Sequence, residues 1–186
     1  AGGAAFWQQT EAQLDAAIAA QIPFGSDLPV ETEVEFPDMA SFGVALALSP
    51  TLTLELDANW TGWSTFDAVH LSFTGLPQLS STIEEEWEDA TNYRAGFSWR
   101  RPAGCEWRFG YVFDETPQPE QHVSPLLPDN DRNGYTVGYG HQFAKTSLDL
   151  ALMYLKFDER TTTVNADGFN GAYNTTAWLF GATFGF

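Results

Sequence analysis

The sequence predicts an all-β protein whose antiparallel, up-and-down strands form part of a transmembrane barrel. Two observations support this fold class. Large apolar residues alternate with small or charged residues along about seven segments of barrel-strand length. The connections between these segments are short and long in strict alternation. A helical membrane protein is excluded, because no run approaches the roughly 18 apolar residues that a spanning helix needs.

The composition is that of a folded and strongly acidic domain. The 186 residues are 44% hydrophobic and 15% aromatic, which argues against intrinsic disorder. The formal net charge is -17, from 25 acidic and 8 basic residues. Nucleic acid is therefore excluded as a partner, because its binding depends on basic contacts to phosphate. The single cysteine, Cys105, excludes an internal disulfide and a cysteine-based zinc cluster.

One stretch near the start has the pattern of a helix. Thr10 and Gln13 fit a capping box, and Pro23 ends the run that follows. Apolar residues recur at helical spacing within it, at Leu14, Ala17, Ile18 and Ile22. We expect a short amphipathic helix over residues 11–22, inside an external loop formed by residues 1–27.

Period-two alternation begins near residue 28 and continues to the end of the sequence. Residues 30–48 predict one long strand, because the phase of the apolar residues survives the Pro37-Asp38 pair. Six further strands are predicted near residues 52–61, 93–100, 107–114, 135–143, 148–154 and 176–186. Residues 28–186 are therefore expected to form the C-terminal part of an outer-membrane barrel.

The two faces of these strands differ in composition. In a soluble sandwich the bulky residues would share a core and the outer face would be charged. Here the bulky face is opposed by Gly, Ala, Ser and Thr with occasional charged residues. Such a face suits the inside of a barrel whose bulky face meets lipid. A soluble antiparallel barrel such as a lipocalin, with its bulky residues pointing inward, is the alternative.

The connections predict how the strands cross the membrane. Outer-membrane barrels have short periplasmic turns and long external loops. We therefore expect the C-terminus at Phe186 to lie on the periplasmic side of a Gram-negative outer membrane. Complete bacterial barrels have an even number of strands, so about seven strands indicate part of a barrel. The short links are residues 49–50, 102–104 and 144–146, and the long ones cover about 75–90, 115–132 and 158–172.

Four stretches resemble known proteins. The last nine residues resemble the C-terminal signal that the barrel insertion machinery reads, with aromatic positions at Trp178, Phe180, Phe184 and Phe186. Residues 60–67, 114–119 and 127–132 resemble, in that order, the FadL/TodX-type family of long-chain fatty acid and hydrocarbon transporters. The resemblance covers roughly residues 28–186.

The resemblance implies a fourteen-stranded barrel, of which this chain supplies the final seven strands and the preceding external loop. Members of that family plug the lumen with an N-terminal hatch and open a lateral route through a kinked early strand. Neither feature lies in this sequence. The remaining strands and the plug would come from upstream sequence or from another chain.

The implied function is passive uptake of hydrophobic small molecules, past the lipopolysaccharide and polar headgroups of the outer membrane. The predicted helix would offer such molecules an apolar patch outside the barrel. The same residues would serve equally to pack the loop onto the barrel rim, because an amphipathic face must be buried somewhere. The candidate substrate-binding residues are Phe6, Trp7, Leu14, Ala17, Ile18, Ile22 and Phe24.

Charged residues alternate onto the face that we expect to line the lumen. Charges inside a barrel pair with one another or with a plug, or an arginine receives a fatty-acid carboxylate. In the last family motif, Asp129, Asp131 and Arg132 fit Asx-turn chemistry as well as ligand binding. The predicted polar network of the lumen consists of Glu55, Asp57, Arg94, Arg100, Arg108, Asp114 and Asp149.

Other chemistry has less support. The acidic run at residues 84–89 is either a solvated loop face or a site for a divalent cation near lipopolysaccharide. His70, His122 and His141 lie in no hydrolase, metalloprotease or phosphate-binding motif. We therefore predict no catalysis, cofactor or metal. An outer-membrane lipid hydrolase and a structural or adhesive barrel are the alternatives.

Overall fold

Strands dominate the part of the chain that the computed structural model describes, residues 30–73, 77–102, 104–125 and 128–186. These residues divide into two units, the smaller with residues 30–33, 70–73 and 77–82 and the larger with Val34–Val69 and Ile83–Phe186. No helix in the described ranges is long and apolar enough to cross a membrane. The predicted helix over residues 11–22, with its candidate binding residues, lies outside the described residues.

Three short strands form a small sheet in the order β1-β4-β5. They are β1 (Val30–Glu31), β4 (Ala68–Phe73) and β5 (Ser81–Glu84), and a 3-10 helix at Pro77–Leu79 lies between the last two. Val30 pairs with Phe73 in an antiparallel register. The prediction of one long strand over residues 30–48 is therefore wrong, because β1 ends at Glu31 and the next strand begins only at Met39. Pro37 lies within the break and limits how early β2 can begin, since it has no N–H to donate to a sheet.

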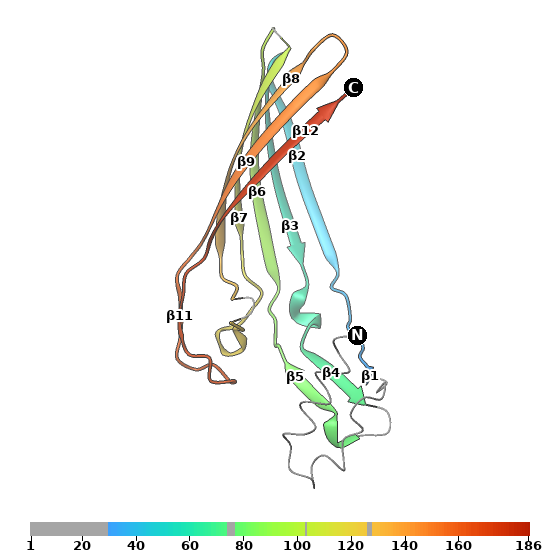
Figure 1. Ribbon diagram of the computed structural model, residues 1–186, viewed down its shortest axis with the longest axis vertical. Coiled ribbons are helices and arrows are strands. Elements are labelled where there is room, and N and C mark those ends of the chain that lie inside the picture. Colours follow the sequence, from blue (N-terminus) through green and yellow to red (C-terminus); the bar gives the residue numbers. More distant parts are fainter. Residues whose placement is uncertain (1–29, 74–76, 103, 126–127) are drawn as a thin grey trace, which may run out of the picture. The chain divides into compact units, whose positions relative to one another are not determined.

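Seven long antiparallel strands form the main sheet, in the order β12-β9-β8-β7-β6-β3-β2 (Figure 1). Each strand pairs with the long strand that precedes or follows it in the chain, which is the predicted up-and-down arrangement. Strands β2 and β12 are its edges and do not pair with each other, so the sheet does not close within the described residues. The strands are β2 (Met39–Ser49), β3 (Leu52–Thr61), β6 (Ala90–Arg100), β7 (Cys105–Asp114), β8 (Arg132–Gln142), β9 (Ser147–Phe157) and β12 (Thr176–Gly185).

Short turns join the strands at the end of the sheet where the C-terminus lies (Figure 1). They comprise residues 50–51, 101–104 and 143–146, so the predicted alternation of short and long connections is confirmed. Gly104 has φ 77, a backbone conformation that glycine adopts without strain. The long connections contain short elements that the sequence did not predict. Besides β4, β5 and the 3-10 helix Pro77–Leu79, these are the 3-10 helices Trp63–Thr65 and Glu120–His122 and the paired strands β10 (Arg160–Thr162) and β11 (Gly171–Tyr173).

The strand register places bulky and small residues on opposite faces, as predicted. One row of directly opposed residues crosses all seven strands at Leu46, Leu54, Phe97, Phe109, Val137, Leu152 and Phe180. We call the face that carries this row the apolar face. The adjacent row, at Ala47, Thr53, Ser98, Arg108, Gly138, Ala151 and Gly181, belongs to the small-residue face. Side chains of the apolar face form no sealed centre, and Phe180 is 80% exposed.

Candidate functional site

The most deeply buried side chains of the described residues lie in the long loops rather than between the strands. Val123 and Thr162 are each 1% exposed, and Gln118 and Asn165 are also buried. Polar residues in loops usually face water. Here Gln118, Thr162 and Asn165 form a small core together with Val123. The core lies between two long connections, residues 115–125 with 128–131 and residues 158–175, which we call the loop pair.

Side chains of the second connection hold the first one in place. Arg160 donates from Nη1 to the carbonyl oxygen of Asp129 at 2.8 Å and from Nη2 to that of Gln118 at 2.7 Å. Asn165 donates from Nδ2 to the carbonyl oxygen of Val123 at 2.8 Å. Buried carbonyl groups need such partners. The loop pair is therefore a hydrogen-bonded structure with a defined shape.

The predicted loop motif at Asp129, Asp131 and Arg132 connects two of the stretches that carry the family resemblance, residues 114–119 and 127–132. Asp131 accepts a hydrogen bond from the backbone N–H of Thr116 at 2.9 Å, and Asp129 accepts one from the Thr116 hydroxyl at 2.7 Å. Arg132 donates to Asp114 at 2.7 Å and to Asp129 at 3.2 Å. These contacts explain the three residues structurally. Their part in ligand binding stays a prediction.

An aromatic cluster stands beside the loop pair. The Trp87 ring meets the ring of Trp63 at 5.1 Å and that of Phe66 at 4.9 Å, both edge to face. The indole N–H of Trp87 donates to Glu85 at 3.0 Å. The backbone N–H of Ser64 donates to Asp89 at 3.0 Å. The cluster thus joins the family motif at residues 60–67 to the acidic run at residues 84–89.

A cavity of about 520 Å³ is lined by residues of the aromatic cluster, the loop pair and the strand ends. We call it the loop cavity. Besides Ala90, its apolar lining residues are the larger Trp63, Trp87, Pro117, Pro128 and Phe157. Sequence reasoning singled out none of these five as binding residues. For Trp63, Pro117 and Pro128 a signal was available, because each lies in a stretch that carries the family resemblance. Trp87 and Phe157 lie outside these stretches and had no such signal.

A second cavity, of about 450 Å³, lies on the small-residue face. Val112, Met153 and Leu155 make part of its lining apolar. It shares Asn92, Asp114 and Arg132 with the loop cavity, so the two cavities adjoin. We call it the sheet cavity.

The predicted lumen charges all lie on the small-residue face, but only some of them pair. Arg108 on β7 forms an ion pair with Asp149 on β9, and Arg132 forms one with Asp114. Arg100 pairs with Glu106 at 3.2 Å. Sequence reasoning missed Glu106, although its position beside Trp107 places it on the same face as Arg108.

Three of the predicted charges form no ion pair with any described residue. Asp57 opposes Arg94 in the register, but the Asp57 carboxylate lies over Gly43 on the other neighbouring strand. Arg94 donates instead to the side chain of Asn92 and lines the sheet cavity. Glu55 opposes Gly96 and has no cation beside it in the register. The expected network is therefore divided into two groups. Glu106 joins Arg100 to Arg108, which also pairs with Asp149, and Arg132 pairs with Asp114 and Asp129, while Arg94 belongs to neither group.

The acidic run contributes to loop structure. Besides the Glu85 and Asp89 contacts, Glu86 lies 3.3 Å from the ring of His122 in the loop pair. No group of three or more His, Cys, Asp or Glu side chains within the described ranges could hold a metal ion. The other histidines have separate contacts, His70 with the Thr82 hydroxyl and His141 with the Phe143 ring.

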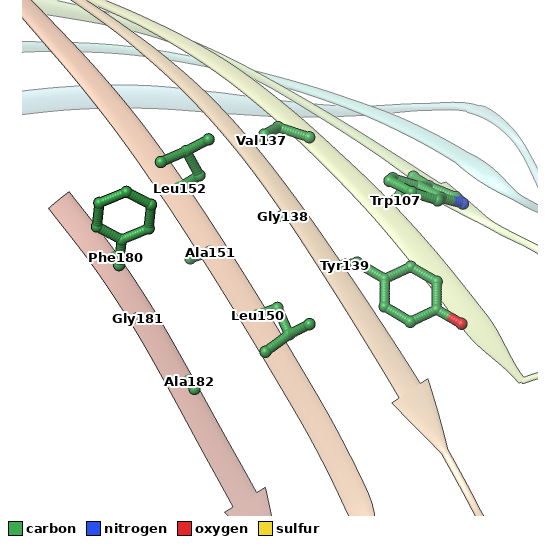
Figure 2. Close-up of a pocket in the computed structure, with 10 residues that line it drawn as sticks. All are labelled: Trp107, Val137, Gly138, Tyr139, Leu150, Ala151, Leu152, Phe180, Gly181 and Ala182. Carbon is green, nitrogen blue, oxygen red and sulfur yellow. The ribbon is translucent and has the colours of Figure 1, made fainter. Parts of the chain in front are cut away.

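The apolar face carries an open depression of about 500 Å³ (Figure 2). Its small lining residues are Gly138, Ala151, Gly181 and Ala182. Figure 2 shows bulky side chains of β7, β8, β9 and β12 around it, namely Trp107, Val137, Tyr139, Leu150, Leu152 and Phe180. Phe180 belongs to the predicted insertion signal. Of the other signal residues, Trp178 packs against Tyr154 at 4.6 Å, and Phe184 stacks on Phe186 at 6.5 Å.

A sequence model of the outer membrane protein transport protein family (OMPP1/FadL/TodX) matches residues 2–186. The chain belongs to this family. The resemblance predicted from the motifs is thus confirmed, and the FadL/TodX family is one of transport proteins rather than enzymes.

Individual FadL/TodX relatives are distant. The chain is 25% identical over 154 residues to the long-chain fatty acid transport protein of Escherichia coli (strain K12), covering 82% of this chain and 34% of that protein. It is 26% identical over 144 residues to outer membrane protein P1 of Haemophilus influenzae, covering 69% and 30%. The chain thus spans about a third of the length of the curated relatives that it matches.

The fold agrees with that of a solved FadL-type structure. The crystal structure of a Pseudomonas aeruginosa FadL homologue superposes with a TM-score of 0.67, at 23% identity, and covers 83% of this chain and 35% of that chain. The seven-stranded sheet is accordingly part of a FadL-type transmembrane barrel, open at β2 and β12.

Proposed function

We propose that the protein carries hydrophobic small molecules, either long-chain fatty acids or hydrocarbons, passively across the outer membrane through its barrel. Family membership and the names of the relatives support transport. The structural observation that carries the proposal is the pair of adjoining cavities, because they link the loop region to the small-residue face. No chemical step is part of the proposal.

The cavities offer a hydrophobic molecule shelter from water and from lipopolysaccharide. Each methylene group that leaves water gains about 0.8 kcal/mol, and the loop cavity provides aromatic and proline surfaces for this contact. From there the molecule would meet Met153 and Leu155 in the sheet cavity. We propose that the residues of the predicted helix, including Leu14, Ile18 and Ile22, collect such molecules outside the barrel.

We also propose an orientation and a set of partners. Long loops outside and short turns in the periplasm are the general arrangement of such barrels, which would place the C-terminus in the periplasm. Lipid and lipopolysaccharide would surround the apolar face. The barrel insertion machinery would read the segment that ends in Phe186, and further strands with a plug would complete the barrel.

Uptake into vesicles tests this function. Vesicles that contain the intact protein should take up radiolabelled oleate or toluene faster than protein-free vesicles, and equal rates would exclude transport. Asn92→Trp adds bulk where the two cavities meet and should lower the protein-dependent rate about tenfold. Thr176→Trp adds comparable bulk to the apolar face and is the matched control, with no expected effect. Equal uptake rates for the two variants would show that the transported molecules do not pass through these cavities.

A further inference from the structure

The charged lining of the loop cavity is unbalanced. Among the described residues that line it, the acids are Glu85, Asp114, Glu115 and Asp129, and Arg132 is the one base. The formal charge of this lining is therefore about -3. A cavity that received carboxylates would be expected to carry unpaired cations instead.

Arg132 is not available to a ligand carboxylate. Its guanidinium donates to Asp114 at 2.7 Å and to Asp129 at 3.2 Å, and it lies 5.5 Å from the centre of the Phe157 ring. An incoming anion would have to displace two carboxylates that are already hydrogen-bonded. The positive charge of Arg132 is thus neutralised by Asp114 and Asp129, two acidic residues of the same cavity lining.

The other two acids have no compensating cation among the described residues. Glu85 accepts the indole N–H of Trp87 at 3.0 Å, and Glu115 accepts the backbone N–H of Thr91 at 2.9 Å. These neutral donors hold the carboxylates in place without cancelling their charge. Both side chains are half-buried, so solvent screens them less than it screens fully exposed acids.

We propose that the loop cavity selects uncharged hydrophobic molecules, such as hydrocarbons and long-chain alcohols, over those that carry a carboxylate. This inference rests on the proposed transport function and narrows its substrate class. Like charges at close range in a partly buried site repel each other strongly. Glu85 and Glu115 are the residues that set the preference, while the aromatic and proline walls bind the hydrocarbon chain of either kind of molecule.

Paired substrates of equal chain length give the test. Vesicles with the intact protein are offered radiolabelled 1-hexadecanol or palmitate, and the rate in protein-free vesicles is subtracted. We expect hexadecanol to enter at least tenfold faster in 20 mM salt. Raising the salt to 300 mM should speed palmitate about threefold by screening and leave hexadecanol unchanged.

A double variant assigns the preference to the cavity. Glu85→Gln with Glu115→Gln keeps both hydrogen-bond acceptors and should speed palmitate about threefold without changing hexadecanol. Glu84→Gln with Glu88→Gln removes the same charge from acids outside the cavity lining and should change neither rate.

Two results would overturn the inference while leaving transport intact. One is an equal rate for both molecules that the cavity variant does not alter. The other is a preference for palmitate that Arg94→Gln abolishes, which would make the unpaired arginine of the sheet cavity a carboxylate site. If neither molecule enters faster than in protein-free vesicles, the proposed function itself fails.

Discussion

Glycine on β8 makes room for charged side chains from both neighbouring strands. Arg108 projects from β7 across Gly138 and Gly140 to reach Asp149 on β9. A Cβ atom at position 140 would lie 2.8 Å from the Asp149 carboxylate and would collide with the Arg108 guanidinium. The Arg108–Asp149 ion pair can therefore form only because Gly140, on the strand between the two residues, has no side chain.

Gly140→Ala should destabilise the protein because it pushes the two charged groups apart. We expect the free energy of unfolding of the intact barrel to fall by about 1–2 kcal/mol, as measured by urea titration in lipid vesicles. Gly181→Ala is the matched control on the same face, since a Cβ there meets only the Ala151 side chain, at 3.7 Å. Equal effects of the two variants would contradict the dependence on Gly140.

Among the structural elements, the loop pair contains the most deeply buried side chains of the described residues. Arg160 holds two backbone carbonyls of residues 115–131, and buried Gln118 and Asn165 extend this network. Hydrogen bonds from a charged donor contribute about 1.5–3 kcal/mol each. We therefore expect the described part of the loop pair to keep its shape in the intact protein.

Arg160→Ala removes both of these hydrogen bonds from the loop pair. Limited proteolysis of the intact protein should then cut residues 115–131 at least tenfold faster, because each 1.4 kcal/mol of lost local stability raises the open population tenfold. The strands of the main sheet should stay resistant. Arg101→Ala, which removes an arginine stacked on Trp99 at the short turns, should leave the loop cleavage unchanged. An unaltered cleavage rate in Arg160→Ala would show that other contacts hold the loops.

The sequence predicted long elements better than short ones, for a physical reason. Alternation over ten residues reports which face of a strand meets lipid, so the seven main strands could be found from it. Two- to four-residue strands such as β1 and β10 show too few alternations to be distinguished from loops. The alternation of apolar residues also continues unchanged through Pro37, although the chain passes there from the small sheet to the main sheet. Alternation alone therefore could not reveal this change.

The candidate site was harder to predict than the strands. The Asp129, Asp131 and Arg132 motif could be found because its spacing is local. The buried role of Gln118 and Asn165 depends on contacts across about 40 residues, which composition does not reveal. Likewise, the choice of Arg94 between Asp57 and Asn92 depends on side-chain direction, which alternation leaves open.

For the whole molecule, the two open edges of the main sheet set a strong requirement. Unpaired backbone N–H and C=O groups in hydrocarbon cost several kcal/mol each, so a sheet that spans a membrane must close. Strands β2 and β12 therefore need partner strands from outside the described residues. Such a closed barrel would enclose the small-residue face and its cavities and would present the apolar face to lipid.

The two faces can be distinguished directly by spin labels on β9 in the intact protein. Cys105→Ser removes the native thiol, and single cysteines at positions 148–154 then carry a nitroxide label. Accessibility to oxygen, which concentrates in lipid, should peak at Leu148, Leu150, Leu152 and Tyr154. Accessibility to a water-soluble nickel complex should peak at Asp149, Ala151 and Met153. The reversed pattern, or no alternation at all, would contradict a barrel whose bulky face meets lipid.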